Sequence, residues 1–412
     1  MTELQQQPVR RRRDRRAQLA QLAADLFRRH GYHAVGIADI AAAAGITGPA
    51  VYRHYPGKQA ILAEVLLSGV DCLAATVAEI LDRPGPAAER LHAVTEALAR
   101  LAVERRDAVA LWRWLGRHLD KEQQAEVRRR GEAPMAQLTA ELRQVRHELS
   151  DPDAGLLCHA AMAVFGSAAD YNVKLGKPRH TGVLGELARA ILASDVVPAA
   201  AEGGSAGDSD ETRGAPVPDV PVAAPRRELL LTAATRLFRQ RGYHAVTLEE
   251  IGTAAGIAGP SIYRHFGSKA DLLFAAGTRM ADRLAHEATR ATAGATDAED
   301  ALRRLIDSYA ATLMDHRDLI AVYLNELSGL SEEQRTALRA LQRSYLGEWV
   351  RLMTVAHPAM STAEARVVVH AALTVANDLG RTGRLQSRPA LQTEMAGLMR
   401  TVIRGCGERF QA

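Results

Sequence analysis

Residues 31–62 read GYHAVGIADIAAAAGITGPAVYRHYPGKQAIL, and residues 242–273 read GYHAVTLEEIGTAAGIAGPSIYRHFGSKADLL. The two stretches align without a gap, and their starting positions differ by 211. The same offset still holds far downstream, where it pairs His159 with His370. Self-similarity at one fixed offset indicates a duplicated unit. We therefore expect two copies of the same half-chain within the 412 residues.

The stretch between the copies has a different composition. Residues 198–225, PAAAEGGSAGDSDETRGAPVPDVPVAAP, are rich in Gly, Ser, Pro and Ala and contain no aromatic residue. Such a segment buries too little apolar surface to offset the entropy of ordering it, so we predict a flexible linker. At about 3.3 Å per residue it stretches to roughly 90 Å, which restrains the two halves very little.

Each half is predicted to be almost entirely helical. Ala, Leu, Arg and Glu dominate, apolar residues recur every three or four positions, and strand-like alternation is missing. Breaks at Gly and Pro divide each half into three short front helices and about six longer rear helices. The expected fold class is all-α, with a three-helix front domain and a roughly six-helix rear domain in each copy. The predicted domains are 1–14 (a flexible arginine-rich arm), 15–62 and 226–273 (front domains), 63–197 and 274–412 (rear domains), and 198–225 (the linker).

Composition excludes several classes of protein. The chain is 47% hydrophobic and has a net charge of +4, which permits buried cores and is only mildly basic. No run of about 18 apolar residues is found, and the basic N-terminus is followed by no apolar run, so we expect no membrane span and no secretory signal. The scattered cysteines Cys72, Cys158 and Cys406 lack metal-ligand spacing, which predicts reduced thiols in the cytoplasm and no metal or cofactor.

Signals that end and begin helices indicate a helix-turn-helix in each front domain. Gly31 is expected to end a first helix over residues 15–30, because glycine readily adopts the left-handed conformation that follows a helix. In the second copy, Thr247 and Glu250 form a capping box at the start of the second helix. The first copy has Gly36 at the corresponding position, which is a weaker start.

The turn and the third helix follow the same logic in both copies. A small residue, Ala41 or Gly252, precedes the turn glycine by four positions and lets two helices cross closely. The third helix begins at the Gly-Pro dipeptides 48–49 and 259–260, where proline has its φ angle preset. The apolar residues expected beneath this helix are Ile46, Val51, Ile257 and Ile262.

Side chains around the third helix are suited to DNA. Tyr, His and Lys can hold phosphates, Arg can also read guanine edges, and the helix N-terminus suits a phosphate oxygen. Tyr55 and Phe266 are assigned to the core instead, and packing onto the first helix is also the alternative for Tyr52 and Tyr263. The candidate DNA-binding residues are Thr47, Gly48, Pro49, Ala50, Tyr52, Arg53, His54, Lys58, Thr247, Ala258, Gly259, Pro260, Ser261, Tyr263, Arg264, His265 and Lys269.

A run of basic residues precedes the first front domain. Arg10, Arg11, Arg12 and Arg13 form its dense centre, whereas only two arginines precede the second front domain. A free basic arm can reach a phosphate or an adjacent groove, and the alternative is a solvated tail. We predict a DNA-contacting arm.

The second copy of the motif resembles the front domain of the TetR family of transcriptional regulators. The matching features are Gly-Tyr, Thr, Ala-Gly-Ile, Gly, Tyr-x-His-Phe and a Lys before Leu-Leu, all within residues 242–273. The first copy departs from this pattern at Gly36, in place of Thr, and at Ile61, in place of Leu. Each half looks like one TetR-family protomer, so the chain resembles a tandem fusion of two.

The resemblance implies a function. The rear helices would form ligand-binding and dimerisation domains, and the protein would be a repressor with a double-stranded DNA operator and a small-molecule effector as partners. Two recognition helices would enter successive major grooves about one turn apart. An effector in a rear domain would pivot the heads and release the DNA.

Fusion of two protomers lets one chain supply its own dimer. We expect an intramolecular pseudo-dimer in which helices 153–174 and 181–195 pack with helices 362–385 and 389–405, because tethering raises the effective concentration of the pair. The alternative is a homodimer of chains with four heads. The recognition helices differ little, which predicts an operator with nearly palindromic halves.

The sequence says less about the effector. Candidate pocket residues, for which ordinary core packing is the alternative, are Trp112, Trp114, His118, Phe165, Tyr171, Tyr309, Tyr323 and Asn325. His159 and His370 fall on the pairing helices and are expected to pack there, because no second ligand follows at metal spacing.

Two other classes of function compete with a regulator. For an enzyme, no GxSxG, HExxH, GxGxxG or CxxC motif is found, and Gly57-Lys58 lacks the remaining residues of a phosphate loop. We therefore expect no catalytic residues. The second alternative is a helical scaffold that binds partner proteins and carries degenerate DNA-binding heads.

Overall fold

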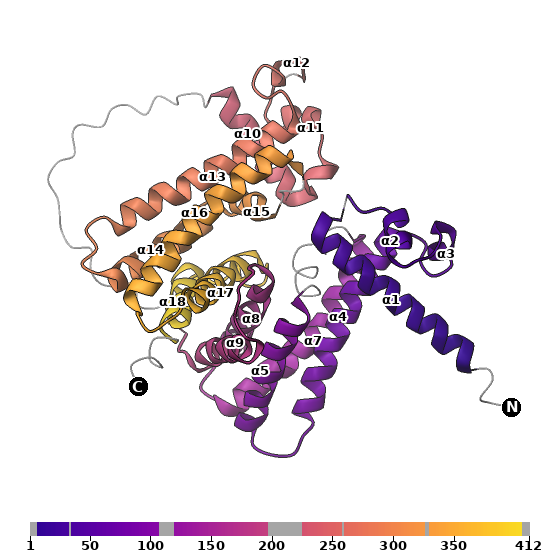
Figure 1. Ribbon diagram of the computed structural model, residues 1–412. Helices are drawn as coiled ribbons and strands as arrows, with labels where there is room; N and C mark the ends of the chain where they lie inside the picture. Colours follow the sequence, from indigo (N-terminus) through magenta and orange to yellow (C-terminus); the bar gives the residue numbers. More distant parts are fainter. Residues whose placement is uncertain are drawn as a thin grey trace. The chain divides into compact units, whose positions relative to one another are not determined.

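The computed structural model describes residues 6–32, 34–106, 119–196, 225–257, 259–325 and 329–405. All regular elements in these ranges are helices, as Figure 1 shows, and this confirms the predicted all-α class. The chain divides into two compact units. The first unit comprises Met1–Ser194, Val350–Thr382 and Leu398–Ala412, and the second comprises Asp195–Trp349 and Gly383–Gly397.

The first unit begins with a helix-turn-helix domain and continues into longer helices. Its long helices α4 and α7 pack along each other, α5 packs on α4 and α9, and α1 packs on α4. Residues 107–118, between α5 and α7, lie outside the described part. The helices are α1 (Gln6–His30), α2 (Ile37–Ala43), α3 (Gly48–Tyr52), α4 (Lys58–Leu81), α5 (Ala87–Glu104), α7 (Lys121–Val145), α8 (Asp151–Gly166), η2 (Ser167–Ala169), α9 (Lys177–Ala193) and α17 (Thr362–Arg381).

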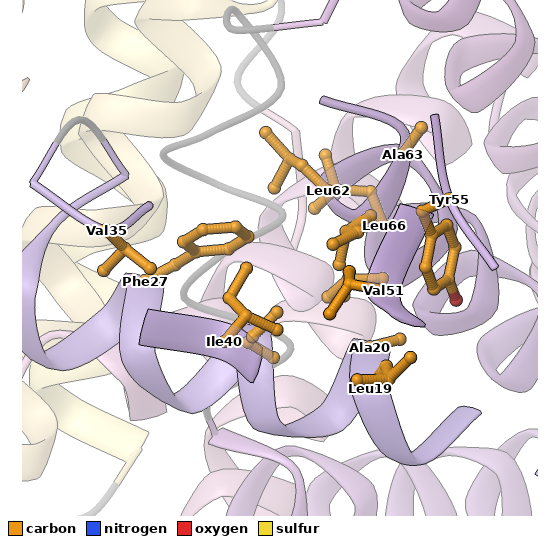
Figure 2. Close-up of a cluster of buried hydrophobic side chains, with 14 of the residues drawn as sticks. Leu19, Ala20, Phe27, Val35, Ile40, Val51, Tyr55, Leu62, Ala63 and Leu66 are labelled. Atoms are coloured by element: carbon orange, nitrogen blue, oxygen red, sulfur yellow. The ribbon is translucent and has the colours of Figure 1, made fainter. Parts of the chain in front are cut away.

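A buried cluster holds the first head together (Figure 2). Leu19 and Phe27 from α1, Ile40 from α2, Val51 from α3 and Leu62 from α4 each expose 2% or less of their surface. Full burial of a side chain of this size contributes about 1.5–3 kcal/mol to the free energy of unfolding. The regularly spaced apolar residues of α1, α2 and α3 therefore form one core with α4, and this core holds the three helices on α4.

Two expectations about this head need correction. Helix α1 begins at Gln6, so the backbone of residues 6–14, which include the arginine run, is helical where a flexible arm was expected. Arginine and glutamine are good helix formers, and the run continues the helix that α4 anchors. The third helix ends at Tyr52, which leaves Arg53 and His54 in the turn that follows.

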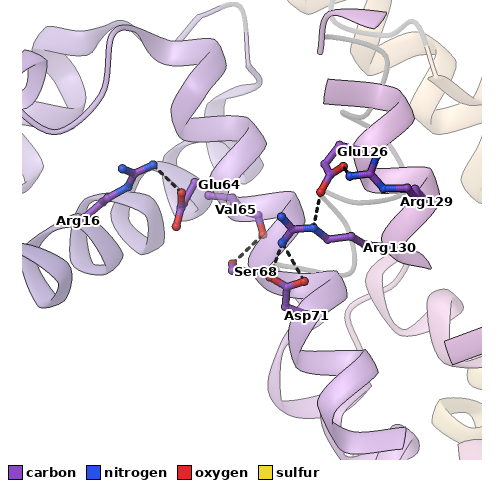
Figure 3. Close-up of polar contacts among 8 residues, drawn as sticks. All are labelled: Arg16, Glu64, Val65, Ser68, Asp71, Glu126, Arg129 and Arg130. Carbon is purple, nitrogen blue, oxygen red and sulfur yellow. Dashed lines mark hydrogen bonds and ion pairs between the residues drawn. The ribbon is translucent and has the colours of Figure 1, made fainter. Parts of the chain in front are cut away.

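Polar contacts tie the head and the rear helices to α4 (Figure 3). Arg16 of α1 donates to the Glu64 carboxylate at 2.8 Å. Arg130 of α7 donates to Asp71 of α4 at 2.8 Å and to Glu126 of its own helix at 2.6 Å. These groups are largely exposed, so each pair adds only about 0–1 kcal/mol.

Helix α4 accounts for the apolar stretch of this unit. Among the described helices it has the length and composition that crossing a membrane would require. Its side chains Leu62, Val65, Leu66 and Val70 are buried within the fold, where α4 packs on α1, α5 and α7. Packing within the fold therefore explains its hydropathy.

Helix α17 belongs to the second copy by sequence, yet it packs in the first unit on α8, η2 and α9. Two predicted bounds were wrong at this contact. Helix α8 ends at Gly166 and not near residue 174, and α17 ends at Arg381 and not at residue 385.

The second unit repeats the head and the first rear helices. Helices α16 and α18 each have residues in both units. The helices are α10 (Arg226–Arg241), η3 (Tyr243–Ala245), α11 (Leu248–Ala254), α12 (Gly259–Ile262), α13 (Lys269–Thr292), α14 (Ala298–Asp315), α15 (Arg317–Asn325), α16 (Glu332–Ala356) and α18 (Leu391–Gly405).

Candidate nucleic-acid interface

The turn glycines have the backbone geometry that the sequence predicts. Gly45 has φ +64° and Gly256 has φ +68°, which is the left-handed region that favours glycine. The amide of Ile46 donates to the Ala41 carbonyl at 3.0 Å and closes the turn. In the second head the amide of Ile257 closes the same turn at 2.8 Å.

The two heads start their second helix differently. In the second head the Glu250 amide donates to Thr247 Oγ1 at 3.2 Å, and the Thr247 amide donates to the Glu250 carboxylate at 2.8 Å. In the first head Gly36 has no side chain to cap α2, and only its amide donates to the Asp39 carboxylate at 2.7 Å. The predicted capping box of the second copy is thus confirmed.

The crossing of the second and third helices is closer in the second head. A Cβ placed on Gly252 would lie 2.2 Å from Cδ1 of Ile262. The first head has Ala41 and Val51 at the same two places, both buried. Compared with the first head, the second head lacks one methyl group at the second helix and has one more at the third helix. The total side-chain volume at the crossing is therefore the same in both heads.

The aromatic residues after the Gly-Pro dipeptide point in two directions. Tyr52 is 57% exposed and Tyr263 is 55% exposed, so neither packs onto the first helix. Tyr55 is buried as expected, and its hydroxyl donates to the Arg16 carbonyl at 3.0 Å. Burial raises the pKa of Tyr55 to about 12, which keeps this hydroxyl a donor. Each head therefore offers one tyrosine to the solvent beside its recognition helix.

The two lysines that follow have a structural role. Lys58 Nζ donates to the carbonyl oxygens of Tyr32 at 2.7 Å and of Val35 at 2.8 Å, and it lies 4.4 Å from the centroid of the Tyr32 ring. Lys269 makes the same contacts in the second head. Desolvation lowers the pKa of Lys58. Each ammonium therefore holds the loop before the second helix.

The remaining candidates are placed as follows. Arg53, Arg264, Thr47, Pro49 and Thr247 are exposed, and Gly48, Ala50, Ser261, His54 and His265 are half-buried. Gly259 and Pro260 begin α12, but their side chains, like those of Arg10 to Arg13, lie outside the described part, as does Ala258 altogether.

The candidate effector residues do not come together in one described cavity. Trp112, Trp114 and His118 lie outside the described residues, as does the side chain of Asn325. Phe165 is buried in α8, and Tyr171 contacts His180 and His370.

An aromatic cluster in the second unit includes residues that the sequence analysis missed. The Tyr309 ring on α14 lies 6.5 Å from the Tyr345 ring and 6.0 Å from the Trp349 ring, both on α16. Trp349 is fully buried, and its indole Nε1 makes no hydrogen bond of standard geometry within the described ranges. Burial raises the pKa of the Tyr345 hydroxyl, and the neighbouring indole partly opposes this effect. The spacing of four between Tyr345 and Trp349 was the available signal, because it places both on one helix face.

Two surface hollows are found along α13 in the second unit. The narrower one is lined by Arg283, Glu287, Thr312 and His316. The wider one reaches the second head, where His265 and Phe266 join Phe274 of α13. Neither is lined by the aromatic cluster.

Two helix-turn-helix heads with exposed, matching recognition residues, each followed by a bundle of longer helices, define a class of bacterial DNA-binding regulators. The family described as bacterial regulatory proteins, tetR family, matches residues 19–65 and 230–276. The tetracyclin repressor-like C-terminal domain matches residues 295–381. The chain belongs to the tetR family and is a tandem fusion of two of its members.

Curated relatives carry regulator names. The chain is 31% identical over 140 residues to the HTH-type transcriptional repressor KstR2 of Rhodococcus jostii, covering 34% of this chain and 68% of that protein. It is 38% identical over 84 residues to the HTH-type transcriptional activator FasR of Mycolicibacterium smegmatis, covering 20% of this chain and 38% of that protein. The match to the regulator HbdR of Aromatoleum covers 54% of that protein, so the alignments span about half the length of these relatives.

Solved structures of the family also match. A tetR-family regulatory protein from Rhodococcus RHA1 superposes with a TM-score of 0.40 at 22% identity, covering 45% of this chain and 98% of that chain. AmtR from Mycobacterium smegmatis gives a TM-score of 0.38 at 27% identity, covering 44% of this chain and 86% of that chain.

Proposed function

We propose that this protein is a ligand-responsive transcriptional repressor that binds one nearly palindromic operator with the two heads of a single chain. The observation that carries the proposal is the repeated Tyr-Arg pair, Tyr52-Arg53 and Tyr263-Arg264, exposed at the end of each recognition helix. Solvent-facing arginine can read a guanine edge with two hydrogen bonds, and tyrosine can hold the adjacent phosphate. Because both heads present the same pair, the two half-sites would be nearly alike.

Backbone groups would position each head on the DNA. The third helix starts at a Gly-Pro dipeptide, and the backbone amide of the glycine at such a start can bind a phosphate oxygen. The ammonium of Lys58 or Lys269 would add a second donor beside it. In the second head the exposed Thr247 offers a hydroxyl, whereas Gly36 offers none in the first. Arg10 to Arg13 would add phosphate contacts along the extension of α1.

The two heads would act as an intramolecular pseudo-dimer. The packing of α17, from the second copy, on α8 and α9, from the first copy, supports this arrangement. A linker of the length of residues 198–225 allows both halves to meet without strain. Tethering raises their effective concentration to the millimolar range, which favours pairing within the chain over a homodimer of chains.

The effector would bind in the second copy, beside Tyr309, Tyr323 and Trp349. All three are buried, and an indole N–H that makes no hydrogen bond of standard geometry among the described residues favours a ligand that supplies an acceptor. The first copy has Leu98 and Leu138 where the second has Tyr309 and Trp349. An apolar molecule with one hydrogen-bond acceptor fits these surroundings. Ligand binding would then change the spacing of the two heads and release the operator. We place this regulation in the cytoplasm.

Enrichment of DNA from a random pool by the full chain tests the proposal. We expect one enriched sequence with two similar halves, and loss of enrichment at one half when either Arg53→Ala or Arg264→Ala is introduced. Arg83→Ala, in a loop of the first rear domain, is the matched control and should leave enrichment unchanged. A pool that is not enriched would contradict the proposal and favour a scaffold with degenerate heads.

A further inference from the structure

The surface that α17 shares with α8, η2 and α9 is built from unequal contributions. All four elements lie in the first unit, so their contacts can be compared directly. In a dimer of identical protomers, each contact across the twofold axis occurs twice. Here the offset of 211 identifies the residue that would make each contact from the opposite side.

An ion pair is made from one side only. The Arg179 guanidinium of α9 donates to the Glu364 carboxylate of α17, which also accepts from Ser361 Oγ at 2.7 Å. Glu364 is buried, and hydrogen bonds from Ser361 and Arg179 outweigh desolvation and lower its pKa. The residue corresponding to Arg179 is Ala390, and the one corresponding to Glu364 is Asp153. An alanine carries no charge, so the reciprocal ion pair cannot form.

A hydrogen bond is also made from one side only. Thr374 Oγ1 of α17 donates to the Asp170 carboxylate, just after η2, at 3.0 Å. The corresponding residues are Ala163 and Arg381. Alanine has no hydroxyl, and Arg381 pairs with Asp378 of its own helix. The polar contact therefore has no counterpart.

Aromatic contacts repeat this pattern. The Tyr171 ring lies 5.1 Å from the His370 ring of α17, and its hydroxyl forms a hydrogen bond with His180 Nε2 at 2.7 Å. The residues corresponding to Tyr171 and His180 are Thr382 and Leu391. Neither offers a ring to His159, the counterpart of His370.

The backbone that presents these groups differs as well. Arg106 Nε donates to the Ala168 carbonyl at 2.7 Å, and the same guanidinium donates to the Tyr171 carbonyl, which fixes the turn after α8. The corresponding Arg317 donates to the Met314 sulfur, and its Nε makes no hydrogen bond to any residue that the structure describes. The end of α8, Gly166, corresponds to Asn377 of α17. Helix α17 continues four residues beyond that position, to Arg381.

We infer that this surface selects unlike halves: α17 of a second copy is specific for the α8–η2–α9 face of a first copy. Two second copies would place Glu364 against Ala390 and leave a buried carboxylate without its guanidinium, which opposes that pairing. Two first copies would still place Arg179 against Asp153 and Tyr171 against His159. They would place Asp170 against Ala163 and so lose the hydrogen bond that Thr374 donates, which opposes that pairing. This inference rests on the proposed pseudo-dimer and names its discriminating contacts. Unlike pairing favours one two-headed unit per chain.

Thiol cross-linking of the full chain tests the inference. Cys72 and Cys406 are replaced by serine, while Cys158 is kept because it is buried and its pKa is raised to about 12. Three double variants are then treated with the short bifunctional reagent dibromobimane. Asp170→Cys with Thr374→Cys reports unlike halves. Asp170→Cys with Ala163→Cys reports two first copies, and Thr374→Cys with Arg381→Cys reports two second copies.

We expect the unlike variant to cross-link within one chain of 44.5 kDa. We expect neither of the other variants to give a band of doubled mass on a denaturing gel. A doubled band from either like-half variant, or no cross-link in the unlike variant, would overturn the inference. A doubled band from the unlike variant would support the selection of unlike halves but contradict pairing within one chain. No DNA is present, so failure of operator binding is a separate result.

A second comparison isolates the ion pair. Glu364→Gln, introduced into the unlike variant, keeps an acceptor for Ser361 but removes the charge that Arg179 needs, and we expect cross-linking roughly fivefold slower. Asp153→Asn, the corresponding change in the first copy, is the matched control and should leave the rate unchanged. Equal rates for the two variants would show that the ion pair does not select the partner.

Discussion

A Cβ added to Gly252 would lie 2.2 Å from Cδ1 of Ile262 and 2.8 Å from the Ile257 carbonyl oxygen. We expect Gly252→Ala to lower the free energy of unfolding of the second unit by about 1–3 kcal/mol, because overpacking forces neighbours to move. Adding Ile262→Val should recover part of this loss, since it recreates the Ala41 and Val51 pair of the first head. Urea unfolding of the single and double variants measures the effect. Equal losses in both variants would contradict volume exchange at this crossing.

The caps of the second helices give a reciprocal prediction. Gly36→Thr should stabilise the first unit by a few tenths of a kcal/mol, because threonine supplies the side-chain acceptor that glycine lacks. The Cβ has room, since its nearest neighbour would be the Asp39 carboxylate at 3.5 Å. Thr247→Gly should destabilise the second unit by a similar amount. Thermal unfolding of both variants measures the changes, and shifts of the same sign would refute the assignment.

We expect Lys269 to contribute to the stability of the second head, whether or not it also contacts DNA. Lys269→Met leaves the carbonyl oxygens of Tyr243 and Val246 without their shared donor, and we expect a loss of about 1–3 kcal/mol in unfolding free energy. If the ammonium also contacts a phosphate, its removal should lower the slope of log K against log salt by about 0.9. Urea unfolding and salt-dependent binding separate the two roles. An unchanged slope would remove Lys269 from the DNA-contacting set.

Pairing in the first unit should weaken in acid. Burial lowers the pKa of His180 to about 4 and that of His370 to about 4, with Arg106 and Arg366 adding to the effect. Both stay neutral in the folded protein while the unfolded chain takes up protons below about pH 6.5. Stability is thus complete above pH 6.5 and falls towards pH 4, by up to about 1.4 kcal/mol per pH unit for each histidine. Urea unfolding across this range should show a smaller slope for His180→Leu than for the exposed control His92→Gln.

The arginine run should act on DNA without sequence preference. Replacing Arg10, Arg11, Arg12 and Arg13 by alanine keeps a good helix former at each position but removes four charges. We expect weaker binding to every sequence and a lower salt slope, because fewer counterions are released. Fluorescence anisotropy over a salt series with operator and random DNA measures this. A slope equal to that of the unsubstituted protein would identify a solvated helix end.

Local rules in the sequence were sufficient for the heads. The positive φ angles at Gly45 and Gly256, the capping box at Thr247 and the buried Tyr55 all follow from steric and hydrogen-bonding preferences within a few residues. The sequence analysis misses the start of α1 because it predicts a flexible arm for the arginine run, although the residues of that run favour a helix. The structural contacts of Lys58 were missed because its acceptors lie more than twenty positions away in the sequence.

The sequence by itself determined the duplication, the all-α class, the helix-turn-helix heads and the family. Helical periodicity, helix caps and turn glycines depend on residues that are close together in the sequence, so they can be recognised without the tertiary structure. The packing of α17 on helices of the first copy was already expected from the fusion. Only the tertiary structure decided that Arg179, Asp170 and Tyr171 face α17 from one side. It also gathered Tyr309, Tyr345 and Trp349 into one cluster. Such contacts join residues far apart in sequence, and helix packing alone brings them together.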